Sequence, residues 1–473
     1  MLAYRKFTLY CVYRGALYAE IRGGQLCDSG TSRHRNSCLT DFLHLAPSAV
    51  SPLTGVVPYV TEVEFGRGGP EVFVAAATGP DMAVLGYATG ANVSGSGAGL
   101  RWESARDAAV GECLERYAAC VIDSENLLIA SYNSLIRSGR KAHRPSEWAL
   151  FDNSQQVPYS IFSEDLVIAW TKGWNPITNE PTFVPACLAH LSANPVLRES
   201  GAELIGPAVS TGCACAPSVT ESLLRGLCEL IERDAFMIVW RNRLNIPEVK
   251  IDEGTALHKT YKSKFLKPGL EYRIWQTTLD FSMPSFFGIL FDHRGPKKRM
   301  IVGGAANPDA ELAAEKTLCE LVQGLSWLEY VGKHKEDSST DFDQIRNFTD
   351  RALLYAFRDL PDAYSFLFNH REPVLLSSIT RKRAQADELL RDCLAEVVAK
   401  GFQPAAVDLT TDDVRKCGYV VTRIVVPGFE TMDGHHRLQM LGGVRWREVP
   451  IKLGFLSTAP TISTLNSFPH PYP

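Results

Sequence analysis

The chain lacks the sequence features of several protein classes. Its 49 basic residues nearly balance its 53 acidic ones, and the formal net charge of −4 offers no positive excess for nucleic acid or an anionic membrane surface. No apolar run approaches the ~18 residues of a membrane span. Near the N-terminus, Arg14 interrupts a short apolar stretch that superficially resembles a signal peptide. These absences predict a cytoplasmic protein with no nucleic-acid or membrane partner.

The cysteines show neither a disulfide framework nor a zinc pattern. Twelve of them are scattered along the chain, and Cys213 and Cys215 are the only close pair. A lone C-x-C without a second pair is weak support for a structural zinc site. We therefore expect reduced cysteines that lie mostly in the core.

The common nucleotide-binding motifs are also missing. The segment SGSGAG, Ser94–Gly99, is rich in glycine but contains no G-x-x-x-x-G-K-[ST] sequence. A dinucleotide fingerprint would need a βαβ context and an acidic partner, for which the sequence gives no support. Its backbone N–H groups could face an anion, but by itself we interpret this segment as a flexible turn.

The order of the predicted elements favours an α+β (mixed α/β) fold. The 473 residues suffice for two or three domains or one large one, and we divide them into an N-terminal extension, 1–45, and a main domain, 46–473. The polar start of residues 335–370 predicts a mobile insertion. Helices are predicted at 103–121, 219–240, 309–330 and 384–400, and strands at 72–77, 83–87, 272–276, 285–291, 300–303, 405–409 and 419–426.

A set of glutamates on one helix face is the most informative feature that is present. In the helix predicted at 219–240, Glu221, Glu229 and Glu232 fall within an arc of about 80°, because each residue advances by about 100°. Leucine and isoleucine cover much of the remaining circumference, so this stripe is partly enclosed. Like charges so placed repel each other unless a cation lies among them. The stripe therefore predicts a metal-assisted phosphate site.

The motif E-x-x-E-R occurs twice, as ECLER at Glu112–Arg116 and as ELIER at Glu229–Arg233. A single copy would be typical of a surface ion pair. Two copies in mostly apolar helices favour Mg²⁺, a hard cation that bridges carboxylates to phosphates, with arginine beside the phosphate oxygens. A third predicted helix adds Lys316, Glu320 and Gln323 on one side.

These segments together resemble the YcaO-domain family, specifically the ATP-dependent cyclodehydratases (D proteins) of azoline-containing peptide biosynthesis. The resemblance runs from about residue 46 to the last residue, in the family's order. The matching pieces are GAGLRWESARDAAVGECLERYA, STGCACAPSVTESLLRGLCELIERDA, NPDAELAAEKTLCELVQG, TRIVVPGF, LGGVRWREVP and the terminal PHPYP.

The resemblance implies a YcaO-like fold with ATP and Mg²⁺ as cofactors. The metal would be held by Glu112, Glu115, Glu229 and Glu232. The tail PHPYP resembles the P-x-P-x-P ending of azoline-forming members, which makes the carboxylate of Pro473 the candidate catalytic base. The full implied cofactor-binding set is Glu112, Glu115, Arg116, Glu221, Glu229, Glu232, Arg233, Lys316, Glu320, Gln323 and Arg423.

The implied reaction converts Cys, Ser or Thr of a ribosomally synthesised precursor peptide, as in bacteriocin biosynthesis, into a thiazoline or oxazoline by phosphorylation of the backbone amide oxygen. Residues 1–45 are too short for a leader-binding domain, so the expected partner is a separate ubiquitin-activating-like protein that binds the leader peptide. A flavin dehydrogenase and a second copy in a homodimer complete the expected partners. Two alternatives stay open, namely thioamide or amidine formation and a nucleotide-silent subunit that binds peptide or scaffolds a synthetase complex.

The chain departs from the family's pattern at several positions that usually carry a hydroxyl, amide or charged group. These changes remove side-chain donors near the expected nucleotide but leave the glutamates intact. The departures are Ala98, Ala108, Ala214, Pro217 and Lys316.

Overall fold

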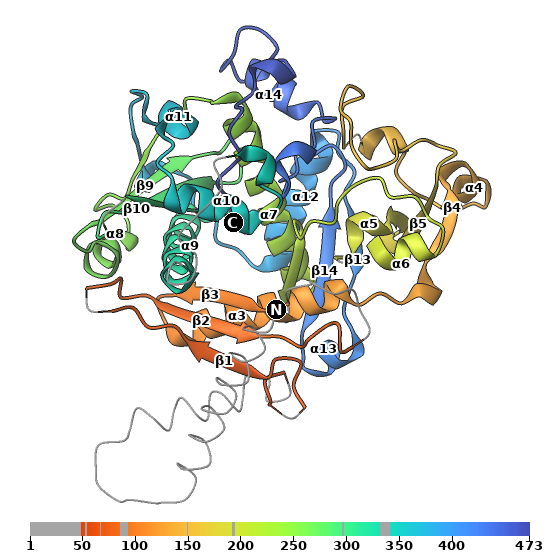
Figure 1. Cartoon of the computed structure of the whole chain (residues 1–473), viewed down its shortest axis with the longest axis horizontal. Coiled ribbons are helices and arrows are strands. Elements are labelled where there is room, and N and C mark those ends of the chain that lie inside the picture. Colours follow the sequence, from red (N-terminus) through yellow and green to blue (C-terminus); the bar gives the residue numbers. More distant parts are fainter. Residues whose placement is uncertain are drawn as a thin grey trace, which may run out of the picture. The chain divides into compact units, whose positions relative to one another are not determined.

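The computed structural model describes residues 49–52, 54–66, 68–85, 93–148, 150–191, 194–295, 298–331 and 341–473. These residues belong to one compact unit, Ser48–Pro473, and the expected extension 1–45 lies outside them. Helices and strands alternate throughout this unit (Figure 1), which confirms the mixed α+β fold. Within the described ranges, no helix is both long and apolar enough to cross a bilayer.

The first sheet contains β1 (Tyr59–Glu62), β2 (Phe73–Thr78) and β3 (Gly95–Gly99), which pair antiparallel in that order. Helix α3 (Trp102–Cys120) packs on β2 and β3 (Figure 1). Two predictions were wrong here. The glycine-rich SGSGAG forms the strand β3, not a flexible turn, and the first residues of the strand predicted at 83–87 lie in a turn.

The glycines of β3 explain why this segment is a strand. A Cβ atom at Gly95 would lie 2.2 Å from the carbonyl oxygen of Ala109, and one at Gly97 would lie 2.4 Å from that of Ala105. Both carbonyls belong to α3, so the helix backbone rests directly on the strand. The glycines therefore serve the close approach of a helix to a sheet.

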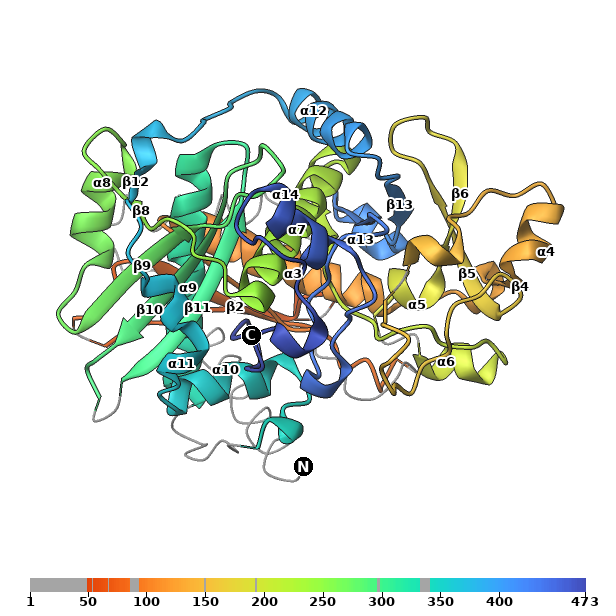
Figure 2. The ribbon, with the colours of Figure 1, turned by 90° about the horizontal axis from the view of Figure 1, so that it is seen from above.

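The second sheet has the order β11-β10-β9, all antiparallel, and it is covered by α9 (Ala310–Val331) (Figure 2). Its strands are β9 (Leu270–Gln276), β10 (Ser285–Asp292) and β11 (Arg299–Ala306). Every residue of β10 is buried, as expected for a central strand with both faces covered. Helix α10 (Phe348–Phe357) packs on β11 as well.

The third sheet has six strands and supports the longest helix of the described part, α7 (Val219–Asn242). Ser218 caps this helix by accepting a hydrogen bond from the Glu221 amide, and Arg243 ends it in the left-handed conformation. α7 contacts β7 and β14 on one side and β11 on the other, so it lies at the centre of the unit (Figures 1 and 2). The strands are β4 (Leu128–Ser131), β5 (Val167–Trp174), β6 (Pro181–Pro185), β7 (Cys213–Ala216), β13 (Ala405–Asp408) and β14 (Val420–Val425).

The remaining elements are short, except for α12 (Ala386–Ala399), which packs on α7. A small parallel pair is formed by β8 (Val249–Lys250) and β12 (Val374–Leu375). The other helices are α4 (Tyr132–Arg137), α5 (Ala186–Ala189), α6 (Asn194–Glu199), α8 (Leu257–Thr260), α11 (Pro361–Tyr364), α13 (Asp412–Lys416) and α14 (Arg445–Lys452).

The segment 335–370, which we predicted to be a mobile insertion, behaves differently where it is described. Residues 332–340 lie outside the described ranges. From Asp341 onward the chain forms α10 and α11, and Leu354 and Tyr355 of α10 belong to a core cluster shared with α7 and β10. This part is integral to the core because its apolar side chains complete that cluster.

Candidate functional site

Three helices present glutamates in the same local arrangement. Each of α3, α7 and α9 follows a strand or turn that contains glycine, and a backbone N–H of that segment donates to a glutamate carboxylate on the helix. Such bonds fix the position of a carboxylate and stabilise its charged form. The three pairs are Ser96 to Glu112 (2.6 Å), Gly212 to Glu229 (2.8 Å) and Gly304 to Glu320 (3.2 Å).

The two E-x-x-E-R motifs use their first glutamate and their arginine in the same way. In α3, Arg116 forms an ion pair with Glu112 one turn before it. In α7, Arg233 Nη2 lies 2.6 Å from Glu229 Oε1 and Arg233 Nη1 donates to the hydroxyl of Thr211 at 2.8 Å. The first carboxylate of each motif is therefore already paired with a cation of its own helix.

The second glutamate of each motif has no such partner. Neither Glu115 nor Glu232 makes a hydrogen bond or an ion pair with any residue that the structure describes. Burial, together with the charges of Glu229 and Glu112, raises the pKa of Glu115 well above its ordinary value. Glu232 is 6% exposed, and burial followed by the charge of Glu320 raises its pKa to about 8. The three helices thus gather more negative charge than their cations neutralise.

The third helix adds a lysine and an amide to the carboxylates of the three helices, and we call these carboxylates the row of glutamates: Glu112, Glu115, Glu229, Glu232 and Glu320. Lys316 Nζ lies 3.7 Å from Glu320 Oε1, and its side chain is 61% exposed. Gln323 donates from Nε2 to the hydroxyl of Ser96 at 2.6 Å. Since Ser96 also donates its amide N–H to Glu112, Gln323 ties α9 to β3 and to the first carboxylate.

The arrangement fits a magnesium–nucleotide complex better than a metal bound by protein alone. Within the described ranges, no group of three or more histidine, cysteine or acidic side chains converges on one point. Magnesium in nucleotide sites needs only one or two carboxylates, because phosphate oxygens and water complete its shell. Glu115 and Glu232 supply oxygen ligands without a hydrogen-bonded or ion-paired partner among the described residues, and their pKa values are raised by burial and by neighbouring glutamates. Glu112 and Glu229, the other two expected metal ligands, are engaged by arginine.

Glu221 shares the helix face but lies apart from this row. It precedes Glu229 by eight residues, which is about 12 Å along the helix axis at 1.5 Å per residue. Its carboxylate is 41% exposed and lies 3.5 Å from Arg225 Nη2. A shared helical face therefore did not bring all three glutamates of α7 to one place.

Arg423 lies on β14 with a different set of neighbours. It is 3% exposed and donates to the carbonyl oxygen of Val209, and its Nη1 lies 3.6 Å from Cys213 Sγ. Its side chain borders a cavity of about 80 Å³ whose walls are largely apolar and include Trp148 and Phe429. None of the glutamates of α3, α7 or α9 lines that cavity.

The C-terminal tail reaches the row of glutamates. Pro469 to Tyr472 are buried and Pro473 is exposed. The hydroxyl of Tyr472 lies so close to Gly304 that a Cβ atom there would be 1.9 Å away. Burial, then the charges of Glu232 and Glu320, raises the pKa of Tyr472 well above its ordinary value. The residue before the terminal carboxylate therefore lies beside the glutamates of α7 and α9.

Our reading of the sequence missed the residues that hold the glutamates in place. Ser96, Gly212 and Gly304 act through their backbone N–H groups, for which a residue type gives no signal. The one available signal was position, because each lies 16 or 17 residues before the glutamate that it binds. Tyr472 could have been noted as the single aromatic residue inside the proline-rich ending.

Comparisons with known proteins identify a matching family model, a related sequence and structures of similar fold. The sequence model of a family described as YcaO cyclodehydratase, ATP- and Mg²⁺-binding, matches residues 96–430. An uncharacterised protein in the tfuA 3′ region of Rhizobium leguminosarum bv. trifolii is 24% identical over 350 residues, which cover 71% of this chain and 76% of that protein.

Two solved structures share the fold at low identity. A heterocyclase in complex with substrate and cofactor has a TM-score of 0.72 and 20% identity, over 95% of this chain and 60% of that one. YcaO from Methanopyrus kandleri bound with AMPPCP and Mg²⁺ has a TM-score of 0.56 and 18% identity, over 84% of this chain and 91% of that one. The chain thus spans about three fifths of the heterocyclase.

Proposed function

The chain belongs to the YcaO family of cyclodehydratases, which bind ATP and Mg²⁺, and from this premise we propose that it forms azolines in a ribosomally synthesised peptide. Its targets would be Cys, Ser or Thr residues, which lose one water each as a thiazoline or oxazoline ring closes. One observation carries the proposal: the buried C-terminal tail ends beside a row of glutamates that lacks enough cations. The row suits a magnesium–nucleotide complex, and the tail brings a carboxylate to it.

We assign the cofactor to the residues whose charges are not compensated. Glu115 and Glu232 would hold Mg²⁺, with Glu320 beside them, and Arg116 and Arg233 would face the phosphates. Bound ATP would supply the phosphoryl group that makes the peptide's amide oxygen a leaving group. Glu112 and Glu229 orient the two arginines through the ion pairs described above. In this assignment both copies of E-x-x-E-R act in the same way: the second glutamate would hold the metal, and the first orients the arginine.

The remaining expected site residues take supporting positions in this proposal. Lys316 adds a mobile positive charge at the exposed end of the row. Gln323 orients Ser96 and through it Glu112. We do not assign Glu221 or Arg423 to the nucleotide and metal. Glu221 pairs with Arg225, and Arg423 borders a separate cavity.

The tail would provide the base for ring closure. In the reaction the side-chain thiol or hydroxyl of the target adds to the preceding carbonyl carbon, and the nitrogen must lose its proton as the phosphorylated oxygen leaves. The carboxylate of Pro473 would accept that proton. A carboxylate is a weak base, so its effect depends on being held at the reacting nitrogen. The burial of the tail up to Tyr472 supports this role.

The proposal includes separate partner proteins. We propose that another protein, of the ubiquitin-activating type, binds the leader of the precursor peptide. A flavin dehydrogenase would then oxidise the ring to an azole where the product is aromatic. We also propose a homodimer, which analytical ultracentrifugation would test.

The proposal is tested with the purified protein, the partner protein, MgATP and a short Cys/Ser/Thr-rich peptide, which we expect to be encoded beside its gene. We expect one water lost per target residue by mass spectrometry, and phosphate release that depends on the peptide. Glu232→Gln should abolish both, while Glu329→Gln, on the same row of helices but paired with Arg294 at 2.8 Å, should not. A gain of sulfur in place of oxygen would instead indicate a thioamide, and no phosphate release would indicate a scaffold.

A further inference from the structure

The last eight residues form an irregular segment that is nevertheless mostly buried. Asn466, His470 and Tyr472 are 4%, 2% and 6% exposed. Prolines at 469, 471 and 473 remove every second backbone N–H. Such a segment cannot be held as a strand of a sheet, so its carbonyl oxygens are the main groups by which the protein can fix it.

Three side chains from two helices donate to three consecutive carbonyls of the tail. Tyr355 donates its hydroxyl to the carbonyl oxygen of Pro469 at 2.6 Å, and Arg351 Nη1 donates to that of His470 at 3.3 Å, both from α10. From α7, Trp240 Nε1 donates to the carbonyl oxygen of Phe468 at 3.3 Å. We call Trp240, Arg351 and Tyr355 the tail clamp.

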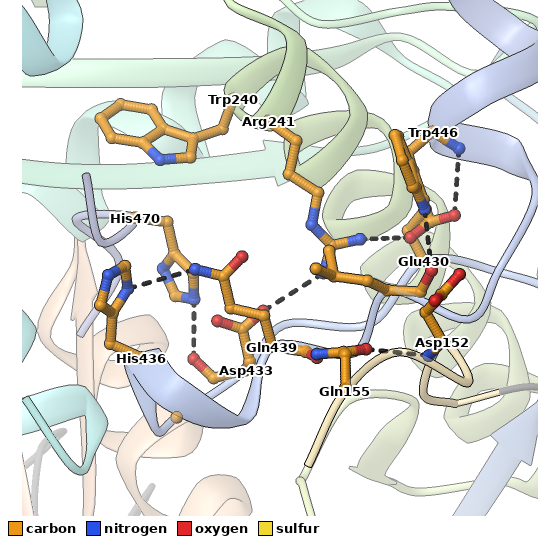
Figure 3. Close-up of polar contacts among 12 residues, drawn as sticks. Asp152, Gln155, Trp240, Arg241, Glu430, Asp433, His436, Gln439, Trp446 and His470 are labelled. Carbon is orange, nitrogen blue, oxygen red and sulfur yellow. Dashed lines mark hydrogen bonds and ion pairs between the residues drawn. The ribbon is translucent and has the colours of Figure 1, made fainter. Parts of the chain in front are cut away.

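A buried ionic network holds the clamp itself in place. Arg351 is fully buried and donates to Asp433 Oδ2 at 2.8 Å. Asp433 also accepts from Arg241 Nη2 at 3.2 Å, and Arg241 is paired with Glu430. Figure 3 shows Arg241 with Glu430 and Asp433 beside it, and the ring of His470 hydrogen-bonded to the backbone of Asp433.

The side chain of His470 closes the same network. Its Nε2 lies 2.9 Å from the carbonyl oxygen of Asp433, so Nε2 carries the hydrogen and donates it. Burial and the charge of Arg351 lower the pKa of His470 well below its ordinary value, which keeps the ring neutral. The tail is thus fixed by its side chain as well as by its carbonyls.

Beyond the clamp the tail runs directly to the glutamates. The ring of Tyr472 packs against Phe236 of α7 and Phe287 of β10, with ring centroids 4.5 Å and 5.8 Å away. Its hydroxyl lies over Gly304, whose N–H donates to Glu320. Pro473 is the next residue, so the position of its carboxylate depends on how firmly residues 468–472 are held.

We propose that the tail clamp positions the terminal carboxylate for ring closure and takes no part in nucleotide binding. Trp240, Arg351 and Tyr355 are then positioning residues, which act through the tail. The inference rests on the proposed role of Pro473. It explains why a proline-rich tail contacts a buried, charged network. The prolines leave carbonyl oxygens as the hydrogen-bond acceptors of the tail, and the network supplies the donors.

The test removes two clamp donors and keeps the aromatic rings. We would compare the wild type with Trp240→Phe/Tyr355→Phe and with a matched control, Trp275→Phe/Tyr364→Phe. The control residues are equally buried in the same core cluster, and Trp275 donates to the Leu367 carbonyl, away from the tail. All three proteins are full-length, and their folding is compared by circular dichroism.

Hydrogen exchange of the C-terminal peptide, measured without nucleotide, reports on the tail directly. A hydrogen bond contributes about 1 kcal/mol, so we expect exchange to rise about fivefold per bond lost and about 30-fold in the double clamp variant. The control should leave it unchanged. With MgAMPPCP as the probe, the dissociation constant should stay within about twofold in both variants, because the clamp does not touch the proposed nucleotide residues.

Assays of ring formation and phosphate release separate this inference from the proposed function. With the neighbouring-gene peptide, the clamp variant should form rings at least tenfold more slowly while phosphate release falls less, and a protein lacking Pro473 should behave similarly. Unchanged exchange would overturn the clamp. The clamp would also be overturned if its variant showed faster exchange but formed rings at the normal rate, while deletion of Pro473 abolished ring formation. If no protein in the set forms rings, the proposed function fails, and the exchange data still decide whether the clamp holds the tail.

Discussion

Replacing Glu232 by glutamine should make the protein more stable and at the same time inactive. Glu232 is buried in α7 without a hydrogen bond or ion pair from any described residue, and Glu320 and Glu229 oppose its ionisation. Glutamine has almost the same shape and no charge. Removing the charge relieves the repulsion in the cofactor-free protein, but it also replaces the carboxylate that we assign to Mg²⁺ with a neutral amide, a weaker ligand for that cation.

The size of the stability gain in Glu232→Gln follows from the linkage between proton binding and folding. The pKa of Glu232 rises from 4.5 in the unfolded chain to about 8 in the folded one. Below pH 4.5 the residue is neutral in both states and costs nothing. As the pH rises, the unfolded state ionises first, so folding is increasingly disfavoured until about pH 8. At pH 7 the cost is about 3 kcal/mol, as an upper limit.

Urea denaturation of the cofactor-free proteins at pH 5 and pH 7.5 tests this reasoning. Glu232→Gln should gain about 2–3 kcal/mol over the wild type at pH 7.5 and much less at pH 5. Glu229→Gln is the matched comparison, because it loses the Arg233 ion pair and should be destabilised by about 1 kcal/mol. Equal gains at both pH values, or no gain at pH 7.5, would refute the reasoning.

Three further predictions concern the tail, the pH response and the core. Gly304→Ala places a Cβ 1.9 Å from the Tyr472 hydroxyl; the displaced tail should slow ring formation at least tenfold in steady-state assays, and an unchanged rate would contradict the tail's placement. Burial lowers the pKa of His190 to about 4. Between pH 6.5 and pH 4 only the unfolded state takes up a proton at this residue, so the free energy of unfolding decreases as the pH is lowered. The loss is about 2 kcal/mol at pH 5, and His190→Gln should flatten this dependence in urea titrations. Arg445→Met leaves Asp234 and Asp280 buried without the partner that lies 2.6 Å and 2.8 Å from them and should cost about 3–5 kcal/mol, largely recovered when Asp234→Asn and Asp280→Asn are added.

Periodic sequence patterns predicted the main elements because burial alone determines them. The helices at 103–121, 219–240 and 309–330 are confirmed as α3, α7 and α9, and the strands of the second sheet agree within a few residues. The glycines of SGSGAG misled us because glycine usually signals a turn, whereas Gly95 and Gly97 allow a helix to approach a strand. That use depends on a tertiary contact, which no local pattern contains.

The candidate site was predictable in its residue types but not in its pairing. The shared face of α7 groups Glu221 with Glu229 and Glu232, yet helical phase says nothing about distance along the axis, which separates Glu221 from the other two. In each E-x-x-E-R motif one glutamate is paired with a described residue and the other is not. The positions of the backbone N–H groups of Ser96 and Gly212 decide which one is paired. Such donors are common to all residues except proline, so only the folded arrangement reveals them.

The measurement that tests the central claim most directly is the mass of the precursor peptide after incubation with this protein, its partner and MgATP. We predict the loss of one water per modified Cys, Ser or Thr, with one phosphate released per ring, and the loss of both in Glu232→Gln. An unmodified peptide, or water loss that persists without ATP or in Glu232→Gln, would contradict the assignment of the glutamate row as the site of ATP-dependent ring formation.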